Sequence, residues 1–283
     1  LGLAALSTGG CDEPPAPAPK HATPSPAATK RTVAPAFDAY VELNPAAIPT
    51  AFQVMADQNV ERMVNLNGGN RADHALDLWV AMATEMKGRV LHCWNAPWRL
   101  LAKGDDVAAL VHDLVDCAGM GYRCVSIEAR PPVRRIDDSR LDALWAKAGD
   151  LGMPVFLHEP GKLPARHPRT RFVLLKPPAD AEGLLGGHAN VFLTGRVPSG
   201  LIRQFPDRIL FGSGLGIGKS LALGPEGAKD GAYGELGPFY TSLREALDDL
   251  PADLRSAVLR ENARGMFEAP SVSGAGDPPS RPR

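Results

Sequence analysis

The chain has 283 residues and a net charge of −1, with 44% hydrophobic and 22% charged residues. These proportions are ordinary for a globular protein, and the balanced charge gives no electrostatic reason to expect nucleic acid as a partner. The four cysteines show no C-x-x-C spacing, which argues against a zinc knuckle and against a disulfide framework. No apolar run approaches the roughly 18 residues that a membrane-spanning helix needs.

Residues 1–11 end in small residues followed by Cys11, which is typical of a signal-peptide remnant with a bacterial lipobox. Thr8 stands where leucine is usual, so a disordered start with a chance cysteine is the alternative. Residues 12–36 are rich in Pro, Ala, Thr and Ser and predict an extended, disordered tether. We therefore expect an exported protein of the bacterial cell envelope, attached to a membrane only through a lipid on Cys11.

Residues 37–268 form the body, and residues 269–283, rich in Pro, Ser and Gly, predict a disordered tail. The body alternates short apolar runs with amphipathic stretches, which is typical of a parallel sheet with intervening helices. Strands are predicted over residues 36–43, 62–66, 89–94, 123–128, 154–158, 171–176, 190–194 and 208–213. Helices are predicted over residues 72–86, 105–117, 139–151 and 239–250.

Eight strands with intervening helices predict a (β/α)₈ TIM barrel. An open, doubly wound sheet is the alternative, because periodicity alone does not show that a sheet closes. Residues 159–170 are polar and rich in proline, so one barrel helix is expected to be missing between the fifth and sixth strands.

Several segments of the body resemble one known family in order and spacing. They are 37–43 (FDAYVEL), 121–128 (GYRCVSIE), 141–158, 167–176 (HPRTRFVLLK), 190–194, 206–213 (PDRILFGS) and 259–267 (LRENARGMF). The chain is thereby identified as similar to the amidohydrolase-related family of metal-dependent hydrolases and carboxy-lyases, whose fold is a TIM barrel.

The resemblance implies a divalent metal, such as zinc, held by histidines and a carboxylate beside an activated water. In this chain the metal motif is degenerate. Tyr40 and Glu42 replace the His-x-His pair of the first strand, Lys176 replaces a histidine, and Gly214 replaces the aspartate. Of the expected ligands His158 remains, with His92 as a further candidate. The sequence therefore predicts no metal and no other cofactor.

Polar side chains still follow the predicted strands, and barrels build their sites at that rim. The catalytic candidates are His158, Lys176 and Glu42, as acid–base groups. The ligand-binding candidates are Tyr40, His92, Glu128, Arg130, Arg196 and Ser213. The cations Lys176, Arg130 and Arg196 predict a small polar or anionic ligand, whereas mutual ion pairs would leave a vacated site.

The segment 213–220 (SGLGIGKS) resembles a phosphate-binding P-loop, although Ser213 replaces a required Gly or Ala and a poor helix follows. Two functions stay open at this stage. One is a hydrolase or carboxy-lyase with an altered or metal-free site. The other is a non-catalytic, ligand-binding lipoprotein, a pseudoenzyme of the same descent, which the missing ligands favour.

Overall fold

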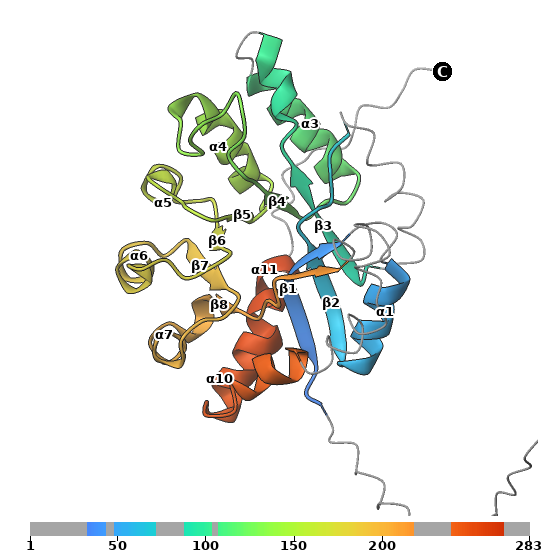
Figure 1. The fold of residues 1–283 in the computed structure, drawn as a ribbon. Coiled ribbons are helices and arrows are strands. Elements are labelled where there is room, and N and C mark those ends of the chain that lie inside the picture. The colour runs from blue at the N-terminus through green and yellow to red at the C-terminus, as the bar shows by residue number, and fades with distance from the viewer. Residues whose placement is uncertain (1–32, 44–47, 72–87, 104–106, 218–238, 269–283) are drawn as a thin grey trace, which may run out of the picture. The chain divides into compact units, whose positions relative to one another are not determined.

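The computed structural model describes residues 33–43, 48–71, 88–103, 107–217 and 239–268 (Figure 1). The chain divides into two units, residues 1–32 and 33–283, and the fold described below is that of the second. The predictions for Cys11, for most of the tether, for the helix over 72–86 and for the tail lie outside the described residues. Within the described part, no helix is long and apolar enough to cross a membrane.

Nine parallel strands form one sheet in the order β8-β7-β6-β5-β4-β3-β2-β1-β9. Their bounds are β1 Ala36–Leu43, β2 Val60–Asn65, β3 Val90–Asn95, β4 Cys124–Ser126, β5 Val155–Leu157, β6 Phe172–Leu174, β7 Val191–Thr194, β8 Ile209–Leu210 and β9 Leu215–Ile217. All eight predicted strands are confirmed, and most are shorter than predicted. Their near-continuous apolar runs are buried on both faces, as in a parallel sheet covered by helices.

The sheet closes on itself because its two edge strands are consecutive in the chain. Between β8 and β9, the carbonyl of Phe211 accepts a hydrogen bond from the backbone N–H of Ala39 at 2.8 Å. The N–H of Gly214 donates to the carbonyl of Tyr40 at 2.8 Å. These bonds join the β8–β9 segment to β1 and confirm the TIM barrel. The described part of the segment that resembles a P-loop, residues 213–217, includes strand β9, and the place where a P-loop would begin its helix lies outside the described residues.

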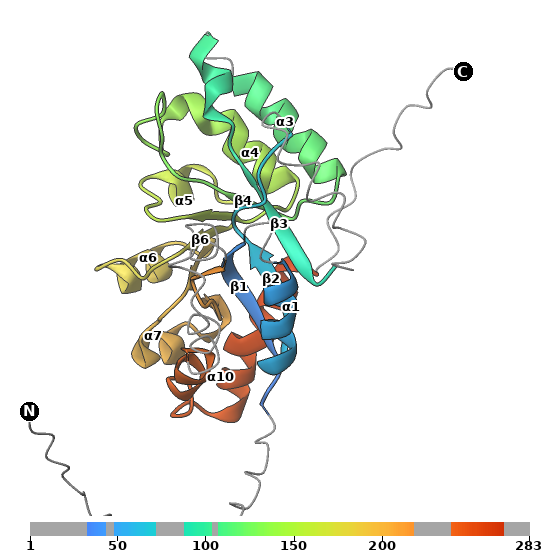
Figure 2. The same cartoon turned by 45° about the vertical axis from the view of Figure 1, so that its right-hand side comes forward.

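The helices lie around the curved sheet in chain order (Figures 1 and 2). They are α1 Ile48–Asp57, η2 Trp98–Lys103, α3 Val107–Gly119, η3 Ser139–Leu141, α4 Asp142–Asp150, α5 Leu163–Arg166, α6 Ala181–Gly187, α7 Ser199–Gln204, η4 Pro206–Arg208, the helical residues 239–245, α10 Ala252–Ser256, the π-helical η5 Ala257–Glu261 and α11 Asn262–Phe267. Between β5 and β6 only the single turn α5 forms, as the polar, proline-rich sequence there predicts.

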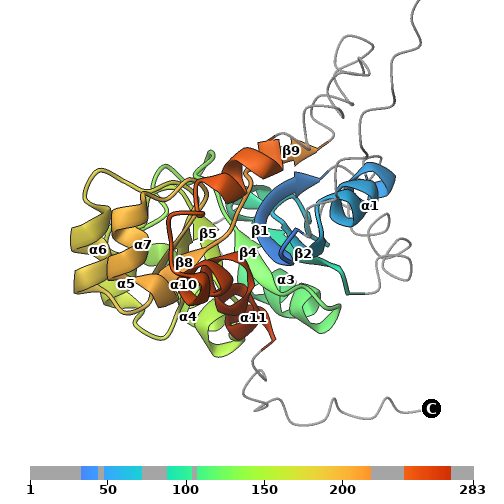
Figure 3. The ribbon, with the colours of Figure 1, turned by 90° about the horizontal axis from the view of Figure 1, so that it is seen from below.

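Two buried apolar clusters stabilise the body. The larger lies between the strands and the helices, and the smaller fills the barrel with residues such as Val64, Phe156 and Val173. Helix α11 covers the barrel, seen from below in Figure 3. Its Phe267 stacks on Phe37 at 5.6 Å and on Phe156 at 6.3 Å between ring centroids. The amino-terminal ends of the strands are thus sealed, and the carboxyl-terminal ends are left for a site.

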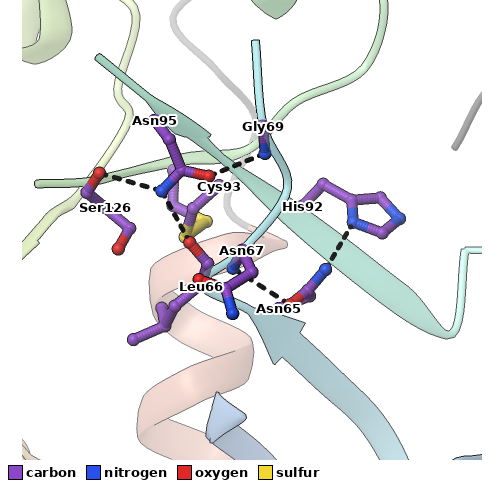
Figure 4. Close-up of a disulfide and its surroundings, with 9 residues drawn as sticks. Asn65, Leu66, Asn67, Gly69, His92, Cys93, Asn95 and Ser126 are labelled. Carbon is purple, nitrogen blue, oxygen red and sulfur yellow. Dashed lines mark hydrogen bonds between the residues drawn. A yellow bond between two sulfur atoms is a disulfide. The ribbon is translucent and has the colours of Figure 1, made fainter. Parts of the chain in front are cut away.

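A disulfide joins Cys93 of β3 to Cys124 of β4 inside the barrel (Figure 4). The two residues are register partners in neighbouring strands, and both are fully buried. The cysteine spacing in the sequence did not suggest this single bridge. The spacing of 31 residues is not a recognisable motif, and the two cysteines become neighbours only because consecutive parallel strands pair.

Candidate functional site

A cavity of about 410 Å³ opens at the carboxyl-terminal ends of the strands. Its lining comes from the ends of β1 to β6 and the loops that follow them, and includes Glu42, Asn67, Asn70, Asn95, Trp98, Ser126, Glu128, Arg130, His158 and Leu175. We call this cavity the barrel mouth. Four of the nine predicted site residues lie here: Glu42, Glu128, Arg130 and His158.

Asn95 organises the floor of the mouth, as Figure 4 shows. Its side-chain N–H₂ donates to the carbonyls of Leu66 at 2.8 Å and Ser126 at 3.2 Å. Its side-chain oxygen accepts from the N–H of Gly69 at 2.6 Å. One amide thus ties the ends of β2, β3 and β4 together. Sequence reasoning missed Asn95; its place directly after the apolar run of β3 was the available signal.

The amide of Asn70 adds a second layer, because its side chain donates to the backbone carbonyl of Asn95 at 3.0 Å. Trp98 is almost fully buried and donates its indole N–H to the carbonyl of Glu128 at 2.9 Å. The mouth therefore has a rigid floor of amides with an indole beside it. Asn95 uses both of its side-chain N–H groups on backbone carbonyls, so it shapes the floor, and recognition of a ligand falls to the other polar groups of the mouth.

The charged groups of the mouth are partly neutralised. Arg130 donates to the carboxylate of Glu128 through two guanidinium nitrogens, at 2.7 and 3.2 Å. Glu42 lies at the end of β1, and His158 is exposed directly after β5. The mouth holds a carboxylate, an imidazole and an internal ion pair, which gives it no net positive charge.

Tyr40, Ser213 and Gly214 form a corner where the barrel closes. The ring of Tyr40 lies against Gly214, whose φ of +67° favours glycine. Burial raises the pKa of the Tyr40 hydroxyl, and the charge of Glu42 raises it further. The Ser213 hydroxyl donates to the carbonyl of Tyr40 at 3.2 Å. Ser213 and Tyr40 are thus held by backbone contacts beside the mouth, and neither lines it.

Asp38 holds this corner from outside the barrel. Its side chain is fully buried, and one carboxylate oxygen accepts from the N–H groups of Tyr40 at 3.0 Å and Ser213 at 2.9 Å. The other oxygen accepts from the hydroxyl of Tyr240. Burial raises the pKa of Asp38, although these hydrogen bonds oppose the shift. Asp38 therefore positions the end of β1 against the segment after β8.

His92 faces away from the mouth, contrary to prediction. Its neighbour Cys93 points into the barrel, and successive side chains of a strand alternate. Its Nδ1 lies 3.2 Å from the side-chain nitrogen of Asn65, whose oxygen already accepts from the N–H groups of Leu43 and Asn67. Asn65 is then the donor, so the ring is neutral. Burial lowers the pKa of His92 to about 4.

The three cations expected to make an anion site do not gather around one cavity. Arg196 is exposed, and its guanidinium lies over the ring of Phe239 at 5.6 Å. Lys176 is exposed after β6, where Leu175 and not Lys176 lines the mouth. Arg130 is paired as described above. Lys176 lies outside the mouth because successive side chains of a strand point to opposite sides, and its neighbour Leu175 already points into the barrel.

The positions that the resemblance aligns with metal ligands do not fit a metal. Tyr40 presents a buried phenol, Gly214 has no side chain and Lys176 lies outside the mouth. Glu42 and His158 supply two donors, whereas a catalytic zinc site needs three protein ligands. Across the described residues, no group of three or more His, Cys, Asp or Glu side chains is arranged to hold a metal ion.

The sequence matches no protein-family model and no curated protein. Solved structures do share its fold. 2,6-Dihydroxybenzoate decarboxylase from Rhizobium is 14% identical over 82% of this chain and 97% of that chain, with a TM-score of 0.54. 4-Oxalomesaconate hydratase from Rhodopseudomonas palustris is 15% identical over 79% and 81%, also at 0.54. An amidohydrolase from Mycobacterium avium subsp. paratuberculosis is 17% identical over 77% and 74%, at 0.52. The likeness establishes the fold, a TIM barrel.

Proposed function

We propose that the protein binds a small polar molecule in the barrel mouth and does so without a metal ion. The observation that carries this is the cavity of about 410 Å³ with its ordered floor of amides. Asn95 and Asn70 are held by hydrogen bonds to backbone groups, so the ligand meets side chains that are already oriented. Preorganised polar groups in a concave site are the usual basis of small-molecule recognition.

A specific observation favours a second function, a metal-independent hydrolase or carboxy-lyase. Glu42 and His158 come from different strands and line the same cavity. A carboxylate and an imidazole together can remove one proton and supply another. The solved relatives of the same fold are by name a decarboxylase, a hydratase and an amidohydrolase. Lys176, outside the lining of the mouth, has no role in this proposal.

The test is a thermal-shift screen of the purified chain with neutral sugars, small amides and small carboxylates. A ligand at about 100 times its Kd stabilises the native state by about 2.7 kcal/mol. Glu42→Gln and His158→Gln should raise the Kd of any such ligand by about tenfold, the loss of one charge-assisted hydrogen bond. Glu245→Gln, an exposed residue of the helix over 239–245, is the matched control and should change nothing.

Each outcome decides between the functions. A ligand that binds and is not converted supports the binding protein. A ligand that the wild type converts, and that Glu42→Gln and His158→Gln do not convert, supports the enzyme. A screen with no stabilising compound, or stabilisation that survives both mouth variants, removes the mouth as the site. Added zinc or manganese that restores turnover would refute the metal-independent part.

We also propose that the protein is exported and lipid-anchored through Cys11. The disulfide between Cys93 and Cys124 supports export, because such bonds persist in oxidising compartments and are rare in the cytosol. Metabolic labelling with a palmitate analogue should mark the wild type and fail in Cys11→Ser. Labelling that persists in the variant would remove the anchor.

A further inference from the structure

A second hollow of about 480 Å³ lies beside the mouth, over the loop between β4 and α4 and the turn α5. We call it the basic cleft. Its lining holds the cations Arg134, Arg135, Arg140, Lys162 and Arg166, together with Asp137 and Asp138. No function described above uses these residues.

Three of the five cations are fixed by carboxylates. Arg135 makes two hydrogen bonds to Asp137, at 2.9 and 3.0 Å. Arg140 donates to Asp138 at 3.1 and 2.8 Å. These hydrogen bonds lower the pKa of both aspartates, so both are charged at neutral pH. Arg166 pairs with Asp142 and donates to the backbone carbonyl of Asp137 at 2.6 Å. Three guanidinium groups are therefore held in place with N–H groups to spare.

Arg134 and Lys162 are different, because neither side chain has a carboxylate partner in the described part of the chain, and both are exposed. Five cations facing three carboxylates leave two positive charges in the cleft. Two charges match a phosphate monoester, which carries close to two negative charges on one group at neutral pH, whereas a single carboxylate or sulfate ester carries one. Arginine suits such a group, since its planar fork binds phosphate oxygens in pairs.

The basic cleft is joined to the mouth. An intermediate hollow of about 360 Å³ shares Arg134, Arg135 and Asp137 with the cleft, and it shares Ile127, Glu128 and His158 with the mouth. Neighbouring hollows thus share walls, and we call the row of three, which includes His158, the trough. A ligand longer than the mouth would extend along this trough toward the cations.

We propose that the basic cleft binds the dianionic phosphoryl group of an elongated ligand, whose other end lies in the barrel mouth. The first part stands on the cleft alone, and the second part rests on the proposed function of the mouth. In this arrangement the cations of the basic cleft bind the charged group of an anionic molecule, and its uncharged end lies in the mouth, which has no net positive charge.

The first test measures the binding of inorganic phosphate to the full chain by calorimetry, with ionic strength held constant by sodium chloride. The double variant Arg134→Ala/Lys162→Ala should raise the Kd more than about tenfold, because two charge-assisted hydrogen bonds are lost. The control Arg123→Ala/Arg169→Ala removes two exposed arginines that do not line the cleft and should keep the wild-type Kd. Equal weakening in both doubles, or no binding by the wild type, overturns the site. If the double variant loses its thermal transition, the glutamine pair replaces it.

The second test compares inorganic phosphate with a sugar phosphate. The wild type should bind the sugar phosphate at least about tenfold more tightly than inorganic phosphate. Glu42→Ala should abolish this difference in affinity and leave the Kd of inorganic phosphate unchanged. Equal affinity for the two would refute the elongated ligand and leave the phosphate site standing. Failure of the mouth as a ligand site thus shows separately from failure of the cleft. Sedimentation with phosphatidylcholine vesicles that contain phosphatidate identifies the source of the phosphoryl group. Protein that sediments with the vesicles indicates a lipid headgroup, and protein that stays in the supernatant indicates a soluble monoester.

Discussion

Removal of the disulfide should destabilise the barrel strongly. Cys93 and Cys124 are 31 residues apart, and in the chain-entropy model a closed loop of that size stabilises the folded state by about 3.7 kcal/mol at 25 °C. Typical domains unfold with about 5–15 kcal/mol, so the bridge contributes a large share of the total. The variant Cys93→Ala/Cys124→Ala keeps the interior apolar and avoids placing new hydroxyl groups there.

The assay is urea unfolding followed by circular dichroism. With a slope of about 3 kcal/mol/M for a body of this size, the midpoint should fall by roughly 1 M or more. The native wild type should also resist dithiothreitol, because both cysteines are fully buried and the reductant reaches them only after unfolding. Cys117→Ala, which removes a buried free thiol, is the control for the loss of a cysteine side chain in the core.

An unchanged midpoint, with an unchanged slope, would refute the reasoning. So would alkylation of Cys93 and Cys124 in unfolded, unreduced protein, since a thiol that reacts is not in a disulfide. Peptide mass spectrometry reads this directly and is independent of the stability measurement.

Three further predictions concern single residues. His92 has a pKa of about 4 in the folded protein against about 6.5 when unfolded, so the unfolded state binds more protons between these pH values. The free energy of unfolding should therefore fall by up to about 3 kcal/mol as the pH drops from 6.5 to 4. His92→Gln should flatten this pH dependence, and a pH dependence that is unchanged in the variant would assign the effect to another group. Burial raises the pKa of Asp38, so ionisation of this carboxyl destabilises the folded state as the pH rises above the pKa of the unfolded chain. Asp38→Asn can keep the hydrogen bonds from Ser213 and Tyr40, so its melting temperature should rise relative to that of the wild type as the pH increases. A difference in melting temperature that does not change with pH would count against this. Gly212→Ala would drive its Cβ into the hydroxyl of Thr194 and to 2.9 Å from the Cβ of Tyr40, and should cost about 1–3 kcal/mol by overpacking. Gly186→Ala, with open space around it, should cost far less.

The sequence alone was sufficient to predict the strands, while closure of the sheet was shown by the structure. The eight strands were predictable because each is a short apolar run between breakers, and a strand covered on both sides must be apolar on both faces. The Pro-rich, polar stretch before β6 correctly predicted that no full helix forms there. Glu42 and His158 could be assigned to the rim because each directly follows or ends such a run, and the ends of parallel strands lie on one side of a barrel.

The tertiary structure decided which way the side chains point. In a strand buried on both faces, the apolar pattern does not mark which parity faces the barrel interior. His92 therefore looked like a rim residue, whereas its neighbours Cys93 and Asn95 are the ones that point inward. For the same reason the sequence did not reveal the disulfide, and Lys176 was predicted to face a cavity that Leu175 lines instead. The basic cleft was out of reach for another reason. Its cations come from two separate loops, which meet only because β4 and β5 are neighbours in the closed sheet.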